Sequence, residues 1–142
     1  MSTTMSKEDA LSFLNEGTRT GHLATVRADG RPHVAPIWFV VDGDDIVFNT
    51  GYESVKGRNL LREGRATMSV DDGVPPYSHV IVSGPVHIGE DPDELLRFAT
   101  SIGGRYMGPE RAAEFGARNG VPGEYVVRLH CETITGARNI SD

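Results

Sequence analysis

The segment 49–66, NTGYESVKGRNLLREGRA, gathers four cations in a chain that is otherwise acidic. The protein has 20 Asp and Glu against 14 Lys and Arg, so its formal net charge is −6. The cations are Lys56, Arg58, Arg62 and Arg65, and Lys56 is one of only two lysines. Nucleic acid would require a broad basic face, so this local cluster favours a small anion as the ligand.

The same segment reads as the start of a helix, with Ser54 as the N-cap. Three features work against helix stability there. Lys56 lies at the positive end of the helix dipole, and Gly57 falls inside the first turn. Arg58 and Arg62 are like charges four residues apart, which also destabilises a helix. The segment therefore favours a role other than helix stability.

A bound phosphate would account for these three features. It would accept hydrogen bonds from the free amides of the first turn and from the Lys56 ammonium. Gly57 would allow the phosphate to approach the backbone closely. The other predicted contacts are Thr50, Ser54, Arg58 and Asn59. The competing interpretation is a solvated basic helix with a flexible glycine, which is what most charge runs are.

A second candidate feature is Pro36, inside a predicted strand at 32–41. Because proline cannot donate to a strand ladder, it indicates an edge or a bulge where backbone is left free. A planar ligand could lie there along Pro36, Ile37 and Trp38. For Trp38, the only tryptophan, burial in the core is the simpler interpretation.

The remaining reactive side chains match no known motif. Five histidines are scattered without metal-ligand spacing, and the single Cys131 has no disulfide partner. No Walker loop, dinucleotide fingerprint or Gly-x-Ser-x-Gly elbow occurs. Tyr77 and His79 follow the Pro75-Pro76 loop and could present ring edges to a planar ligand. Surface or packing roles are equally open for both.

Short strands separated by Gly and Pro turns predict an α+β, mainly β fold: a six-stranded, mostly antiparallel barrel with short flanking helices. Turn signals at Asp29-Gly30 and Asp42-Gly43 predict that the first three strands form a meander. The fifth strand is expected to bend at Gly84-Pro85. The predicted strands are 20–27, 32–41, 45–50, 65–71, 77–90 and 123–135, and the predicted helices are 6–15, 54–63, 91–102 and 108–118.

At 142 residues the chain is expected to form one domain, residues 6–136, between tails 1–5 and 137–142. No apolar run approaches the roughly 20 residues that a membrane span needs. The N-terminus has no apolar signal core. We therefore expect a cytoplasmic protein that does not associate with membrane or nucleic acid.

Three motifs together resemble the pyridoxamine 5′-phosphate oxidase-like superfamily of split β-barrels. They are GHLATVRADGRPHVAPIWFVVDGDDIVFNT, then SVKGRNLL, then VSGPVHI, and the resemblance covers about residues 6–136. It is strongest to the short branch that uses the deazaflavin coenzyme F420. That branch implies hydride transfer from reduced F420 to a small, planar, electron-poor substrate such as a quinone, an enone or a tetrapyrrole-like molecule. FMN-binding relatives share much of the pattern, so an FMN oxidoreductase and a non-catalytic cofactor carrier are the alternatives.

The resemblance also implies roles for individual residues. It places the cofactor phosphate at Lys56, Arg58 and Asn59, with Thr50 and Ser54 alongside. It places Pro36, Ile37 and Trp38 beside the ring, and Tyr77 and His79 near the cofactor. No residue is implied as the catalytic acid.

Family members are homodimers whose cofactor lies at the subunit interface, so one site would draw on both chains. The chain lacks the C-terminal substrate-binding segment of true pyridoxamine phosphate oxidases, and vitamin B6 oxidation is therefore not expected. The helical stretch 92–120 is longer than in minimal members. It either covers the substrate side or pads the barrel.

Overall fold

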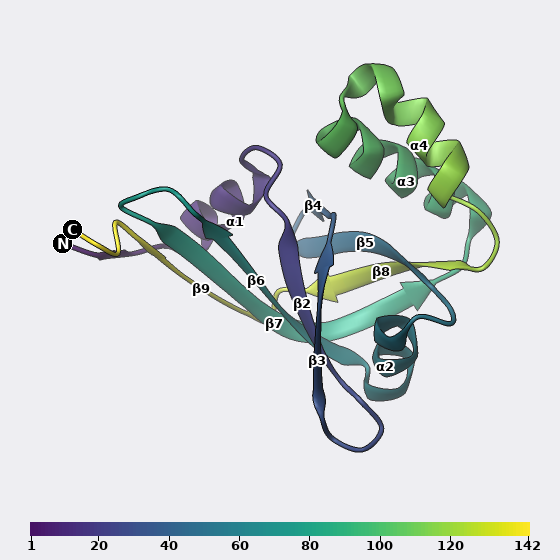
Figure 1. Cartoon of the computed structure of the whole chain (residues 1–142), viewed down its shortest axis with the longest axis horizontal. Helices are drawn as coiled ribbons and strands as arrows, with labels where there is room; N and C mark the ends of the chain where they lie inside the picture. Colours follow the sequence, from purple (N-terminus) through teal and green to yellow (C-terminus); the bar gives the residue numbers. More distant parts are fainter.

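The computed structural model describes residues 1–142 as a strongly curled antiparallel sheet with helices at its ends (Figure 1). The sheet order is β3-β2-β6-β7-β8-β5-β4, with β9 beside β7 and β1 beside β9. The elements are β1 (Thr3–Thr4), α1 (Lys7–Asn15), β2 (Gly21–Val26), β3 (Pro32–Ile37), β4 (Val40–Asp42), β5 (Asp45–Gly51), α2 (Val55–Glu63), β6 (Arg65–Asp72), β7 (Ser78–Gly89), α3 (Pro92–Met107), a 3₁₀ turn η1 (Pro109–Arg111), α4 (Ala112–Asn119), β8 (Glu124–His130) and β9 (Thr133–Arg138).

Strand β7 joins the two halves of the barrel. Its residues 78–85 pair with β6, and its residues 86–89 pair with β8. The change of partner falls at Gly84-Pro85, where a bend was predicted. A side chain at position 84 would collide with the carbonyl of His130, so glycine is required for this crossing. The α+β, mainly β split-barrel fold is thereby confirmed.

The predicted meander is wrong, because the predicted strand 32–41 breaks at Trp38 and Phe39. Its two parts, β3 and β4, lie at opposite ends of the sheet order. At the break, side chains of α3 form hydrogen bonds with the backbone of Phe39. Its N–H donates to the Tyr106 hydroxyl at 3.3 Å, and its carbonyl accepts from Arg105 at 2.8 Å. These long-range contacts replace the strand–strand hydrogen bonds that the predicted strand 32–41 would have formed there.

The predicted last strand also breaks, at Cys131 and Glu132, into β8 and β9. The Cys131 N–H leaves the ladder and donates to the Asp44 carbonyl at 3.0 Å. Together with β1 these two breaks give nine strands rather than six. The predicted tails are likewise part of the fold, because β1 pairs with 137–138 and Met5 is buried in the core.

The core fills the inside of the curled sheet. Phe39 and Phe48 are fully buried there, and Leu60 reaches it from α2. Helix α1 closes one end with Phe13 and Leu14, as its capped amphipathic pattern predicts. Burial of these apolar side chains is the main stabilising contribution to the fold.

Helices α3 and α4 form a hairpin beside β5 and β8 (Figure 1). Asp91 caps α3 by accepting a hydrogen bond from the Glu94 N–H at 3.1 Å, as predicted. The helix continues to Met107, five residues past its predicted end at Ile102. Close contact with α4 explains this extension. A side chain at Gly103 would collide with Phe115, and one at Gly104 would press on Ala112, so the added part of α3 packs closely on α4.

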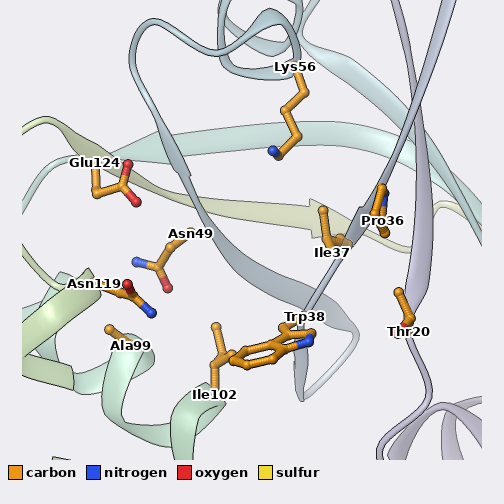
Figure 2. Close-up of a pocket in the computed structure, with 10 residues that line it drawn as sticks. All are labelled: Thr20, Pro36, Ile37, Trp38, Asn49, Lys56, Ala99, Ile102, Asn119 and Glu124. Carbon is orange, nitrogen blue, oxygen red and sulfur yellow. The ribbon is translucent and has the colours of Figure 1, made fainter. Parts of the chain in front are cut away.

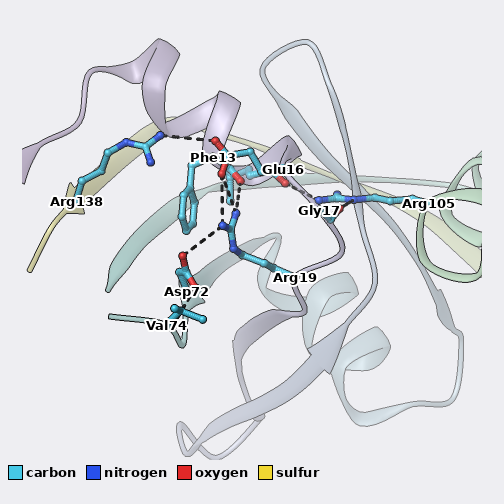
Figure 3. A network of polar contacts seen from close by, with 9 residues as sticks. Phe13, Glu16, Gly17, Arg19, Asp72, Val74, Arg105 and Arg138 are labelled. Carbon is cyan, nitrogen blue, oxygen red and sulfur yellow. Dashed lines mark hydrogen bonds and ion pairs between the residues drawn. The ribbon is translucent and has the colours of Figure 1, made fainter. Parts of the chain in front are cut away.

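Two arginines join α3 and the segment after α1 to the end of α1 (Figure 3). Arg105 donates to the Leu14 carbonyl at 2.7 Å and to the Gly17 carbonyl at 3.1 Å. Arg19 donates to the Phe13 carbonyl at 2.9 Å. Both guanidinium groups therefore donate to carbonyls at or just after the end of α1. None of the helices in the structure has the length and apolar character needed to cross a membrane.

Candidate cofactor site

A cavity of about 430 Å³ lies where β3, α2, β5 and the α3–α4 hairpin meet. Its volume falls within the range of small-molecule sites. One wall is mainly apolar and the other is polar (Figure 2). The lining residues are Thr20, Pro36, Ile37, Trp38, Asn49, Lys56, Ala99, Ile102, Asn119 and Glu124.

The apolar wall begins at the predicted ring-binding strand. Pro36 and Ile37 end β3, which is an edge strand, as the proline predicted. Trp38 follows them and is 37% exposed, so its predicted burial in the core is wrong. Its ring stacks on Tyr106 with centroids 5.0 Å apart and planes 2° apart. The Tyr106 hydroxyl donates to the Arg19 carbonyl at 2.7 Å, so the stack is held in place.

The polar wall consists of Lys56, Asn49, Asn119 and Glu124, from four different elements. Figure 2 shows Lys56 reaching into the cavity from α2, with Asn49 and Glu124 across from it. Burial raises the pKa of the Glu124 carboxyl, and the positive charge of Lys56 acts in the opposite direction. Lys56 itself makes no salt bridge or hydrogen bond within the chain.

Both polar atoms of the Asn49 carboxamide are buried without a partner in the protein. Leaving a buried donor or acceptor unpaired costs about 1–3 kcal/mol per group. Asn49 lies on β5 among apolar residues and directs its amide toward the cavity (Figure 2). A polar ligand in the cavity would satisfy these two atoms.

The start of α2 is built as predicted, but its hydroxyls are already used. The Ser54 hydroxyl accepts from the Gly57 N–H at 3.0 Å and donates to the Gly51 carbonyl at 2.9 Å. It also lies 3.0 Å from the Thr50 hydroxyl. These contacts fill the hydrogen-bonding capacity of Ser54. Ser54 and Thr50 therefore shape the helix start that presents Lys56, rather than facing the cavity themselves.

Gly57 also has an internal explanation. A side chain there would collide with the Gly51 carbonyl, because the first turn of α2 packs directly on the end of β5. The close approach that the sequence suggested is thus between two stretches of backbone. The expected contact between Gly57 and a ligand is not needed to explain the glycine.

Lys56 and Arg58 do not face the same cavity. Residues two apart on a helix point in nearly opposite directions. Lys56 lines the large cavity, whereas Arg58 lines a second groove of about 350 Å³ with Arg27 and Arg31. Of the cations predicted to share one phosphate, only Lys56 faces the cavity that contains Pro36.

Asn59, the third member of the predicted phosphate set, is buried and 3% exposed. Its amide nitrogen donates to the Thr25 hydroxyl at 3.0 Å, and its oxygen accepts from Arg62 at 3.0 Å. Asn59 therefore joins α2 to β2 and holds Arg62 against the helix. The role of Asn59 in the structure is therefore to pack α2 on β2 and to position Arg62.

Tyr77 and His79 lie far from the cavity within one chain. Tyr77 directly precedes β7 and His79 is its second residue. Figure 1 shows that this end of β7 lies on the side of the chain termini, away from α2 and α4. The Tyr77 carbonyl accepts from the Ile140 N–H at 3.0 Å, and His79 pairs with Ala137. A single chain does not bring these two side chains together with Lys56.

Sequence reasoning missed the residues that complete the site. No local sequence pattern indicates Tyr106 and Arg105. Their hydrogen-bond partners, Phe39 and Arg19, are 66 or more residues away in the chain. Asn49 did carry a local signal. An asparagine directly after the apolar run Ile46–Phe48 is unfavourable in a strand, and such a position is a reason to look for a ligand.

Comparison with known proteins identifies the family. A family model described as pyridoxamine 5′-phosphate oxidase matches residues 7–136. An F420H(2)-dependent biliverdin reductase from Mycobacterium tuberculosis (strain CDC 1551 / Oshkosh) is 29% identical over 143 residues, spanning 99% of this chain and 94% of that protein.

Two solved structures show the same architecture. A conserved hypothetical protein from Mycobacterium tuberculosis superposes with a TM-score of 0.82 at 29% identity, covering 97% of this chain and 89% of that one. An F420 reductase superposes with a TM-score of 0.69 at 30% identity, covering 87% of this chain and 94% of that one. The chain therefore belongs to the pyridoxamine 5′-phosphate oxidase family and has its split-barrel fold.

Proposed function

We propose that the protein is an oxidoreductase that transfers hydride from reduced coenzyme F420 to a small, planar, electron-poor substrate. The observation that carries the proposal is the cavity in which Lys56, unpaired at the start of α2, faces the strand end Pro36–Trp38. Relatives named as an F420H(2)-dependent biliverdin reductase and an F420 reductase, at 29–30% identity, support F420 as the cofactor.

The residues present fit a flat cofactor that carries a phosphate. The amides of Val55 and Lys56 have no acceptor within α2, and the Lys56 ammonium lies beside them. Pro36–Trp38 and Ile102 offer an apolar surface for a ring. When bound, F420 supplies the hydride.

The chain's own residues orient that ring and limit the access of water to it. Trp38, held by Tyr106, covers one side, and Ala99 and Ile102 of α3 narrow the cavity beside it. The α3–α4 hairpin therefore supports the interpretation that the stretch 92–120 covers the substrate side. Exclusion of water strengthens polar contacts inside such a site.

Titration with F420 and, separately, with FMN tests the choice of cofactor. We expect F420 to bind at least about tenfold more tightly than FMN, a difference of about 1.4 kcal/mol. The measurement is cofactor fluorescence at increasing protein concentration. Tight FMN binding without F420 binding would replace our proposal by an FMN oxidoreductase of the same fold.

The remaining alternative is a carrier that binds F420 without turnover. Oxidation of reduced F420, followed by absorbance in the presence of quinone, enone and tetrapyrrole acceptors, separates the two functions. Hydride transfer to any of these supports the enzyme. Micromolar F420 binding with no oxidation by any acceptor supports the carrier.

We further propose that the protein acts as a homodimer with the cofactor at the subunit interface. One face of the sheet formed by β3, β2, β6 and β7 is partly exposed. Its centre, beside His22 and the pair Asp71–His79, carries small or apolar side chains in paired positions. These residues, which we call the open sheet face, are Ala24, Val34, Thr67, Ser69, Ile81 and Ser83. A second copy on this face would also bring new residues, such as Tyr77 and His79, within reach of a cavity.

Val34→Glu tests the dimer. Val34 is 62% exposed on the open sheet face, so a charge there would be buried in the proposed interface and would disfavour association. We expect wild-type protein to sediment as a dimer and the variant to dissociate at least about tenfold more readily. Leu61→Glu, on α2 and also 62% exposed, is the matched control. A monomeric wild type would refute the proposal.

A further inference from the structure

The most unusual side chain in the cavity is Asn49. It shares a face of β5 with Val47, which packs on Leu95 and Phe98 of α3. Asn49 is the position on that face where the apolar contact with α3 ends and the cavity begins (Figure 2). Both of its amide atoms are buried, and neither has a partner in the protein.

This arrangement destabilises the fold. A buried amide without partners loses its hydrogen bonds to water and gains none in return. An aliphatic residue at this position would suit both the strand and the neighbouring apolar cluster. A residue that lowers stability and lines a cavity is characteristic of a functional position.

Two further polar side chains lie on the same side. Asn49 pairs directly with Val126 of β8, and Glu124 is two residues before Val126, so Glu124 points to the same face of the sheet. Asn119, the last residue of α4, lines the cavity as well. Amide donors, amide acceptors and a carboxylate thus form one wall, which we call the amide wall, opposite Trp38.

We propose that the amide wall, Asn49 with Asn119 and Glu124, binds the substrate through a ring edge on which an N–H lies next to a carbonyl, as in a cyclic amide or imide. A carboxamide is complementary to such an edge, because its N–H₂ donates to the carbonyl while its oxygen accepts from the N–H. This inference rests on the proposed function, which places the cofactor elsewhere in the cavity.

The placement of the other residues favours substrate over cofactor as the partner of this wall. The proposed cofactor contacts lie at the end of β3 and Trp38, on the first turn of α2 and at Ile102 of α3. The amide wall lies on β5, β8 and the end of α4, on the side that the α3–α4 hairpin covers. A substrate that stacks against the cofactor ring would present its edge to this wall.

The first test is binding of phthalimide and N-methylphthalimide, which differ only in the imide N–H. Trp38 is the sole tryptophan and lines the cavity, so its fluorescence reports binding without cofactor or turnover. We expect wild-type protein to bind phthalimide about tenfold more tightly than N-methylphthalimide. Asn49→Leu should remove this preference. Asn15→Leu, at the exposed end of α1, is the control and should retain it.

The second test is thermal unfolding of the same variants. Asn49→Leu should raise the Tm by about 3 °C or more, because it removes two unpaired buried groups. Asn119→Leu provides an independent variant should Asn49→Leu fail to fold, and it should weaken the imide preference. A lower Tm for Asn49→Leu with an unchanged imide preference would make Asn49 a structural residue and overturn the inference.

A third measurement separates this inference from the proposed function. The affinity of Asn49→Leu for F420 should remain within about twofold of the wild type. A large loss of F420 affinity would assign the wall to the cofactor and overturn its assignment to substrate. If wild-type protein binds no F420 but distinguishes the imides, the proposed function fails while the amide wall stands. If wild-type protein does not distinguish the two imides, the amide wall fails.

Discussion

Replacing Lys56 with alanine is expected to weaken F420 binding by about 10- to 100-fold while leaving the thermal stability unchanged or slightly raised. Lys56 lines the cavity and makes no salt bridge or hydrogen bond within the chain, so its removal breaks no internal contact. A hydrogen bond to a charged group contributes about 1.5–3 kcal/mol, which corresponds to this loss of affinity. The stability does not fall, because the positive charge opposes the dipole at the start of α2.

The chain supplies a matched control in Lys7, its other lysine. Lys7 lies on α1 and pairs with Asp44 at 3.0 Å. Lys7→Ala should leave the F420 affinity unchanged and alter stability only slightly, because an exposed pair is worth about 1 kcal/mol or less. Fluorescence titration and thermal unfolding measure both quantities. A large loss of stability for Lys56→Ala with unchanged F420 affinity would show Lys56 to be structural.

Replacing Arg105 with alanine is expected to destabilise the protein by about 3 kcal/mol and to lower its Tm by about 10 °C. Its guanidinium donates to three carbonyls from three segments, those of Leu14, Gly17 and Phe39, at 2.7, 3.1 and 2.8 Å. Burial lowers the pKa of this guanidinium below its ordinary value. Its loss would leave three carbonyls without a donor and release α3 from the break between β3 and β4.

Two variants identify the cause of this effect. Arg97→Ala removes an exposed arginine from the same helix and should change the Tm by about 2 °C or less. Arg105→Lys keeps the charge but cannot reach three acceptors with one planar group, so it should recover only part of the stability. Equal stability of the lysine variant and the wild type would contradict the hydrogen-bond explanation.

The effect of Arg105 should extend to the site. Phe39, whose backbone it holds, follows Trp38 directly, and Trp38 forms one side of the cavity. Loss of this anchor should therefore loosen the ring-binding strand as well as the fold. Lys56→Ala is expected to change affinity alone, so the two variants separate a ligand contact from a support of the cavity.

The basic segment shows how far a local pattern can be interpreted. Its conflict with helix stability pointed to Lys56, which lines the cavity and has no partner within the chain. The same pattern grouped Lys56 with Arg58 and Asn59, which the helix directs elsewhere. Composition and spacing identify a cluster along the chain, whereas the direction of each side chain depends on what the helix packs against.

The sequence by itself determined the features that depend on neighbours in the chain. Helix starts at Ser54 and Asp91 were predicted because each cap bonds an amide three residues away. The edge strand at Pro36 and the bend at Gly84-Pro85 follow from the backbone properties of proline and glycine. The family was also evident from motifs along the chain.

The tertiary structure alone decided the break at Phe39, because its backbone partners, Tyr106 and Arg105, are more than 60 residues away. It placed Trp38 at the cavity rather than in the core, and Tyr77 beside Ile140 near the C-terminus. It also brought Asn49 and Glu124 to one wall. No local interaction encodes these arrangements, since each depends on the pairing of β-strands or on the docking of α3 against the barrel.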